Sequence, residues 1–491
     1  MGFAARTPRF VACFFVRRFA CFCVAALTLA GCADTGGIAP ASTPIDAAAV
    51  DPGSALRATQ QDAGWPQQAW WMRMGDPALD ALVVQSVAGN PDMRIALARS
   101  QLAEGLARIA GATIEPNVSA GGAFGRTRFP RLSTPQPLGG HTTWNNHISI
   151  DLVYDLDLWG RNRAILQSAL DSVQATAAEA RTVQINLETS VVRAYVDLAL
   201  QYALLDVNQA NLVRQRSIYE IVRKRASRGL ASELELSQAQ TPIPALVAQV
   251  QQSERQIALA KNQIAILSGQ GPGAGDKLQR PNLLLETPVA VPPSLPAELV
   301  GHRPDVVAQR WRVQAAAQGI KAAKADFYPN IDLVASVGLA SAAFGNFFTF
   351  VSRDAIGHNV GAALSLPLFD GGRRRGNYGV ATANYDLAVE SYNKTVLAAF
   401  QSVADEVISL QSLGGQQAEI EASLKSAQHA YDLASKGYRG GFTDYLNVLA
   451  TEYELRRQQQ ALALVQAARL DAWARLMQAL GGGFDAAKDQ D

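Results

Sequence analysis

The sequence predicts a mainly helical fold that is built twice and also carries strands for a membrane β-barrel. Three observations support this fold class. A turn-and-helix pattern recurs, so that Gly160-Arg161 matches Gly372-Arg373 (372 − 160 = 212), and the turn at 228–232 matches 440–444. Each copy contains a very long helical pattern, and a pair of alternating segments precedes it. A duplication of this length favours a pseudo-symmetric wall or tube, because neither copy buries its apolar faces alone.

Each copy is expected to contain one long helix. Residues 161–227 lack proline and repeat apolar side chains every three or four positions, so about 66 residues predict a rod of roughly 100 Å. In copy two the equivalent stretch shows two apolar faces, which is typical of a helix that packs against two neighbours. One face holds Tyr378, Ala381, Tyr385, Ala388 and Tyr392, and the other holds Val389, Val396, Phe400, Val403, Val407 and Leu410.

An antiparallel return helix should follow each glycine-containing turn. Ser232 and Glu235 have the spacing of a capping box, which predicts the start of the first return helix. Pro242 and Pro244 predict a kink in that helix. Upstream, the periodic apolar residues predict helical structure from Asp76 to about Ala112.

Four segments are predicted to be strands: 117–129, 144–158, 331–339 and 360–368. Lengths of this order suit tilted membrane strands, which need about 9–11 residues. An open four-stranded sheet leaves unpaired backbone groups in lipid, so several chains must pool their strands to close a barrel. The clearest alternation places one apolar face on the second segment, formed by Ile148, Ile150, Leu152, Tyr154, Leu156 and Leu158.

The first 31 residues are predicted to be a signal peptide. Arginines at 6, 9, 17 and 18 precede a 12-residue apolar run from Phe19 to Ala30, which is too short to span a bilayer. Leu29-Ala30-Gly31-Cys32 resembles a bacterial lipobox, in which the cysteine is acylated and becomes the mature N-terminus. Ala33 after this cysteine favours the outer membrane. The other three cysteines lie in the leader, so no disulfide is expected.

The sequence gives no support for an enzyme, and no catalytic residue, metal or cofactor is expected. The five histidines are scattered, and no phosphate-binding loop or nucleophile elbow is present. The glycine-rich stretch at 269–273 follows a helix, so it is interpreted as a linker. Asp151, Asp155 and Asp157 alternate along a polar strand face and are expected to be solvated. A net charge of +1 gives no support for nucleic-acid binding.

Several motifs resemble those of the outer membrane factors, the TolC-like channels of tripartite efflux systems, and in particular their lipoprotein subgroup. They lie at 295–305 and 321–330, at the strand-to-helix junctions 157–161 and 369–373, and at Trp71 with 75–79. The resemblance implies a homotrimer with a 12-stranded β-barrel and a helical periplasmic α-barrel. It also implies three partners: a periplasmic adaptor protein, an inner-membrane pump and the lipid of the outer membrane.

The expected organisation has four parts: a signal peptide at 1–31, a lipidated tether at 32–75, and two repeats at 76–282 and 283–491. The resemblance places a periplasmic gate at the hairpin turns. The candidate gate residues are Asp444, Arg439 and Arg228, although Asp444 is equally well interpreted as the N-cap of its return helix. The residues expected to dock the adaptor are Gly229, Leu230, Gly440, Gly441, Phe442 and Thr443.

Two classes of function follow. The first is a passive export duct, with small-molecule efflux as the main interpretation and type I protein secretion as the alternative. The second is a structural or enzymatic lipoprotein that uses its long helices as a scaffold. The alternating strands favour a duct, because a coiled-coil scaffold needs no membrane strands. The sequence does not identify the cargo.

Overall fold

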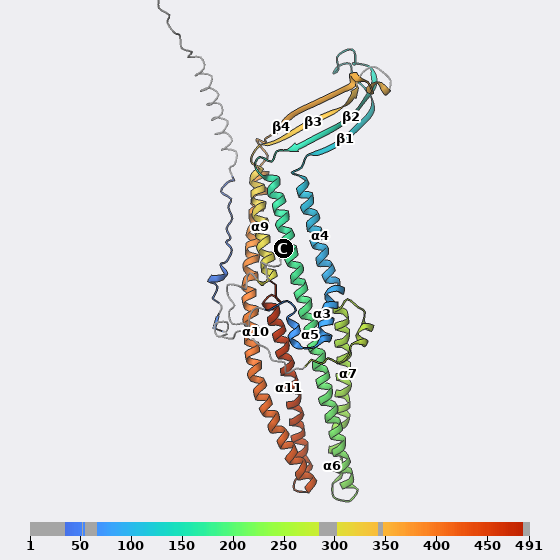
Figure 1. The fold of residues 1–491 in the computed structure, drawn as a ribbon, viewed down its shortest axis with the longest axis vertical. Helices are drawn as coiled ribbons and strands as arrows, with labels where there is room; N and C mark the ends of the chain where they lie inside the picture. Colours follow the sequence, from blue (N-terminus) through green and yellow to red (C-terminus); the bar gives the residue numbers. More distant parts are fainter. Residues whose placement is uncertain (1–34, 52, 55–65, 284–301, 342–346, 485–491) are drawn as a thin grey trace, which may run out of the picture. The chain divides into compact units, whose positions relative to one another are not determined.

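The computed structural model describes residues 35–51, 53–54, 66–283, 302–341 and 347–484 (Figure 1). The predicted signal peptide, Cys32 and residues 295–301 lie outside these ranges. The chain forms two compact units. The first unit contains the described residues of 1–44, 101–175 and 310–391. The second unit contains the described residues of 45–100, 176–309 and 392–491.

The first unit contains one antiparallel sheet in the order β1-β2-β3-β4 (Figure 1). Its strands are β1 (Asn117–Arg128), β2 (Thr142–Asp155), β3 (Asn330–Ser341) and β4 (Ile356–Ser365). Short 3-10 turns at Phe347–Phe350 and Arg353–Ala355 precede β4, and others cover Ala47–Ala49, Trp70–Met74 and Pro272–Lys277. Within the described residues β1 and β4 each have one neighbouring strand, so the sheet has two unpaired edges.

Two predicted strand ends are wrong. β2 ends at Asp155 and β4 ends at Ser365, three residues before the predicted ends at 158 and 368. Asp157 has a positive φ of 43°, which turns the chain out of the sheet. β4 ends two residues before Pro367, and proline has no N–H with which to continue the hydrogen bonding between strands.

The long helices match the prediction. α5 (Arg161–Ala226) has 66 residues and α10 (Arg373–Gly440) has 68. Of the two apolar faces predicted for copy two, the one with Val389, Val396, Val403 and Val407 is fully buried. On the other face Tyr378 is buried, and the remaining residues are half-buried. Each helix begins in the first unit and ends in the second.

The return helices begin as predicted, but the first one breaks. Ser232 accepts a hydrogen bond from the Glu235 backbone and Glu235 accepts one from the Ser232 backbone, which confirms the capping box. The kink is predicted at Pro242 and Pro244, and the return helix divides there into α6 (Glu233–Gln240) and α7 (Pro242–Leu267). Thr241 between them keeps helical dihedrals (φ −52°, ψ −42°), so the prolines interrupt the helical hydrogen bonds but do not turn the chain out of the helical conformation. In copy two, without these prolines, α11 (Tyr445–Ala479) is continuous.

The stretch from Asp76 to about Ala112 is helical as predicted, with one break. It is two helices, α3 (Pro77–Gly89) and α4 (Pro91–Ala112), and Asn90 between them is extended at φ −70° and ψ 133°. A residue before proline is forced out of the helical region by the proline ring. The Asn90 amide then donates to the Leu267 carbonyl at 2.8 Å, which ties this break to the end of α7.

The same docking occurs in copy two, where α9 (Pro304–Ala325) begins beside the end of α11. Gly269 and Gly481 have φ values of 72° and 88°. A Cβ atom on either glycine would overlap a backbone carbonyl, that of Gly89 or that of His302 respectively. Arg303 donates to the Ala479 carbonyl at 2.9 Å. The two repeats therefore close with equivalent contacts, and only glycine fits at these two positions.

The second unit has two apolar cores. The larger core draws on α3, α5, α7, α10 and α11, and its most buried side chains include Leu79, Val191, Leu198, Ile264, Val403, Val407, Leu470 and Leu476. A smaller core lies near the hairpin turns and contains Ile218, Val222, Ala239, Tyr438, Tyr445, Val448 and Leu455. Among the described helices, none is long and apolar enough to cross a membrane.

Candidate functional site: the strand-to-helix junctions and the hairpin turns

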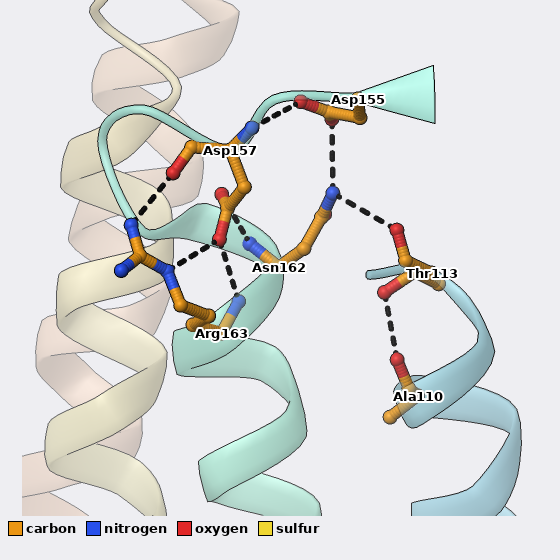
Figure 2. A network of polar contacts seen from close by, with 6 residues as sticks. All are labelled: Ala110, Thr113, Asp155, Asp157, Asn162 and Arg163. Carbon is orange, nitrogen blue, oxygen red and sulfur yellow. Dashed lines mark hydrogen bonds and ion pairs between the residues drawn. The ribbon is translucent and has the colours of Figure 1, made fainter. Parts of the chain in front are cut away.

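The junction between β2 and α5 is held by one buried carboxylate, that of Asp157 (Figure 2). Its Oδ1 accepts from the Asn162 backbone N–H at 2.9 Å, and its Oδ2 accepts from the Arg163 backbone N–H at 3.0 Å. The Arg163 side chain donates two hydrogen bonds to Asp157, from Nε to Oδ2 at 3.1 Å and from Nη2 to the backbone carbonyl at 2.7 Å. Asp157 therefore binds the first turn of α5 to the strand that precedes it.

Asp155 and Asn162 extend this network (Figure 2). Asp155 accepts from the Asp157 backbone at 2.8 Å and from the Asn162 amide at 2.9 Å. Burial acts to raise the pKa of Asp157, but hydrogen bonds from Arg163 and Asn162 outweigh it and hold the pKa below its usual value. The expectation that Asp155 and Asp157 are merely solvated is therefore wrong, because they fix the geometry of the junction.

In copy two an Asp–Arg pair also holds the strand-to-helix junction, but its two residues are four positions apart in the sequence and not six. Asp370 accepts from the Arg374 side chain at 2.7 Å and from the Gly372 backbone at 3.0 Å, and Arg374 donates to the Pro367 carbonyl at 2.6 Å. The hydrogen bond from Arg374 is the main reason that the pKa of Asp370 is lowered. An Asp–Arg pair therefore anchors both long helices at the end of a strand.

The predicted gate and docking residues lie at the two hairpin turns. Gly229 and Gly441 have φ values of 72° and 80°, as tight turns require. Arg228, Leu230, Arg439, Gly440 and Phe442 are exposed, and Thr443 is half-buried. Asp444 is the N-cap of α11 and accepts from the Asn447 backbone at 3.1 Å. Within the described part of this single chain, Asp444 forms no ion pair with Arg439 or Arg228.

The structure adds a contact between the two hairpins that the sequence analysis missed. Arg225, at the end of α5, donates to the Tyr438 carbonyl at 3.0 Å, and its guanidinium lies 4.7 Å from the centre of the Tyr438 ring. Nothing in the sequence distinguishes Arg225 from its neighbours Arg223 and Lys224. This contact joins the first turn to the second.

A second missed feature is a buried polar cluster close to the turns. Gln215 donates to the Tyr445 hydroxyl at 3.0 Å and to the Ala239 carbonyl at 2.8 Å, and the Arg214 guanidinium lies 5.3 Å from the centre of the Tyr431 ring. Glu452 is 6% exposed and borders a hollow of about 620 Å³ with Asn211, Gln215 and Leu449. Burial raises the pKa of Glu452 to about 7, although Arg214 and Arg456 oppose the rise.

The described residues contain no group of three or more His, Cys, Asp or Glu side chains placed to hold a metal ion. The features that the geometry does bring together are structural joints and turn contacts. These contacts hold the long helices and the two hairpins in position.

Comparison with known proteins identifies the family of this chain. The family model described as "Outer membrane efflux protein" matches residues 82–270 and 295–482. The chain is 44% identical over 361 residues to the fusaric acid resistance protein FusA of Burkholderia cepacia, covering 73% of this chain and 68% of that protein. It is 30% identical over 440 residues to the multidrug resistance outer membrane protein MdtP of Shigella flexneri, covering 87% and 88%.

A solved structure has the same fold. The outer membrane protein VceC of Vibrio cholerae superposes with a TM-score of 0.79 at 33% identity, covering 86% of this chain and all of that one. The two matched ranges of the family model also correspond to the two copies found in the sequence. The chain belongs to the outer membrane efflux protein family.

Proposed function

We propose that this chain forms a homotrimeric duct that carries small organic molecules across the periplasm and the outer membrane. The observation that carries the proposal is the strand register. Ile150 lies opposite Val337, Tyr154 opposite Leu333, and Ala335 opposite Val360. Directly opposed residues share a sheet face. The apolar positions of the neighbouring strands therefore coincide on one face, as a lipid-facing barrel wall needs.

The opposite face supports a water-filled interior. Asp151 lies opposite Ser119 on β1 and opposite Ser336 on β3. One chain offers four strands and two unpaired edges, and lipid does not tolerate such edges. Three copies would join β1 of one chain to β4 of the next and close a 12-stranded barrel. The long helices that follow each strand pair would then line up as a helical tube.

The cargo and partners follow from relatives and from the turns. The names of FusA and MdtP assign those proteins to resistance against fusaric acid and multiple drugs. A small-molecule cargo, delivered by an inner-membrane pump through a periplasmic adaptor, is therefore the main proposal. The exposed turn residues Leu230 and Phe442 are 63% and 90% exposed and would contact the adaptor. Asp444 with Arg439 or Arg228 would line the gate.

Lipid attachment at Cys32 would anchor the mature chain to the inner leaflet of the outer membrane. The lipobox-like motif Leu29-Ala30-Gly31-Cys32 supports this part of the proposal. Acyl chains contribute roughly 0.8 kcal/mol per buried CH₂, so two or more chains hold a protein firmly.

The test uses the purified full-length protein in planar bilayers and in mild detergent. Chemical crosslinking should give a trimer, and reconstituted protein should conduct ions in discrete steps. In cells that lack their own duct but retain the adaptor and pump, the chain should restore resistance to small organic toxins. A stable monomer without conductance would refute the duct, and restored export of a secreted protein alone would refute the small-molecule cargo.

A further inference from the structure

A hollow of about 660 Å³ lies beside the junction of β2 and α5, and neither the fold nor the export function accounts for it. One wall comes from the turn after β2 and the first turns of α5, and the other comes from the last turns of α9 and from Tyr328. The residues that matter for its chemistry are Leu158, Trp159, Arg163, Lys321, Lys324 and Tyr328.

The aromatic wall of this hollow is held by a ring stack and a hydrogen bond and is still exposed to solvent. The Trp159 ring stacks on Tyr328 with centroids 4.6 Å apart and planes 20° apart, and its Nε1 donates to the Pro329 carbonyl at 2.8 Å. Trp159 nevertheless remains 46% exposed, and Leu158 beside it is 56% exposed. An aromatic side chain that is fixed and half-exposed at the end of a membrane strand is typical of the boundary between hydrocarbon and headgroups.

The charged side chains around the hollow include more positive than negative groups. Arg161 pairs with Asp326 at 2.7 Å and Arg163 pairs with Asp157 at 3.1 Å, so both carboxylates near the hollow already have a cationic partner. Lys321 and Lys324 are exposed and form no ion pair among the described residues. A spacing of three places them on the same face of α9. The hollow therefore presents two uncompensated positive charges beside an aromatic surface.

The hollow adjoins the inner strands of the sheet and not the two edges that barrel closure would use. It lies between α5 and α9, which pack directly, since Ser168 on α5 donates to the Ala315 carbonyl on α9 at 2.9 Å. These helices adjoin β2 and β3, the two inner strands of the sheet. Barrel closure uses the outer strands β1 and β4, so a neighbouring chain does not need to cover this site.

The equivalent junction, between β4 and α10, folds without the aromatic pair and without Lys324. The positions equivalent to Trp159, Lys324 and Tyr328 are Gly371 (371 − 159 = 212), Gly111 (324 − 111 = 213) and Glu115 (328 − 115 = 213). Lys321 corresponds to another basic residue, Arg108 (321 − 108 = 213), which pairs with Glu104. Copy two still anchors its helix through Asp370 and Arg374. The stacked aromatic pair and Lys324 therefore serve something other than the turn itself.

We propose that this hollow binds the headgroup of an anionic phospholipid in the inner leaflet of the outer membrane. Lys321 and Lys324 contact the phosphate and the second negative charge or hydroxyls of the headgroup. Trp159 and Leu158 contact the glycerol and the upper acyl chain. The lipid would fix the depth of the strand-to-helix junction at the periplasmic surface, where the long helices leave the membrane.

The experiment is a lipid titration of the intact trimer in mild detergent, followed by native mass spectrometry. The probes are phosphatidylglycerol, phosphatidylcholine and glycerol phosphate. Wild-type protein should bind phosphatidylglycerol at least ten-fold more tightly than phosphatidylcholine. A lysine near a lipid surface contributes about five-fold in affinity, so Lys321→Gln/Lys324→Gln should weaken phosphatidylglycerol binding about 30-fold.

Two variants complete the design. Lys425→Gln/Lys436→Gln removes the same charge from exposed positions of α10 and should change binding less than two-fold. Lys321→Arg/Lys324→Arg keeps both charges and should bind like wild type. Equal binding of phosphatidylglycerol by wild type and the glutamine variant would overturn the proposal. Glycerol phosphate binding as tightly as the lipid, with the same dependence on the lysines, would make this a site for free phosphate and also overturn it.

Discussion

Glu452 is predicted to make the hairpin end of the second unit less stable as pH rises. Its carboxyl is buried, and the groups that face it are Arg214 on α5, Tyr431 on α10, and Tyr445 and Arg456 on α11. The two arginines favour the charged form, but burial disfavours it more strongly. The folded-state pKa is therefore raised from 4.5 to about 7.

The sign and size of the effect follow from linkage. A carboxyl with a raised pKa binds its proton more tightly in the folded state, so its full contribution to stability is present below pH 4.5. That contribution is lost as pH rises and is essentially gone above pH 7. A rise from 4.5 to about 7 corresponds to roughly 3 kcal/mol of local stability. Most of this change falls between about pH 5 and pH 8, on the order of 2.5 kcal/mol.

Glu452→Gln isolates this effect, because glutamine has the shape of the protonated acid and does not titrate here. Hydrogen exchange of the amides at 448–455 should be measured for both proteins at pH 5 and pH 8. Comparing the two proteins at each pH cancels the intrinsic dependence of exchange on pH. The protection of wild type relative to the variant should fall by about 70-fold between these values. A ratio that does not change with pH would refute the reasoning, and so would one that rises.

Three further predictions test the membrane, anchoring and gate assignments. Leu152→Arg, on the apolar face of β2, should cost roughly 2–4 kcal/mol and reduce trimer yield, whereas Asp151→Asn on the polar face should be mild; equal damage would show that the faces are misassigned. Cys32→Ser should abolish labelling with radioactive fatty acid, and persistent labelling would exclude Cys32 as the lipid site. Asp444→Ala should raise single-channel conductance or change cation selectivity if Asp444 lines the gate. Wild-type conductance with a lowered melting temperature would make Asp444 only a helix cap.

The duplication, the long helices and the pairing of strands could be predicted because each depends on a local repeat in the sequence. The period-two alternation in β2 specifies which side chains share a face, and a slip of one residue would move them all to the other face. The wrong strand ends had a different cause. The chain leaves the sheet where Asp157 adopts a positive φ, and aspartate gives only a weak sequence signal for that conformation.

The break before Pro91 was predictable and the polar contacts were not. A proline restricts the residue before it, so the Asn90-Pro91 pair carried the signal for two helices. By contrast, Arg225 and Tyr438 are 213 residues apart, and Arg214 and Glu452 are 238 apart (452 − 214 = 238). Sequence periodicity places each of these side chains on a helix, but only the packing of the two hairpins determines which of them meet.

The two interpretations of Asp444 need not exclude each other, and the cap geometry shows why. The Asn447 backbone and side-chain amides both donate to Oδ1 of Asp444, at 3.1 and 2.8 Å. Oδ2 accepts no hydrogen bond among the described residues, so it remains available to an arginine of a neighbouring chain. Asparagine caps helices about as well as aspartate but carries no charge. Asp444→Asn should therefore keep the melting temperature of wild type, and a change in conductance in this variant would assign the effect to the charge at the gate and not to the cap.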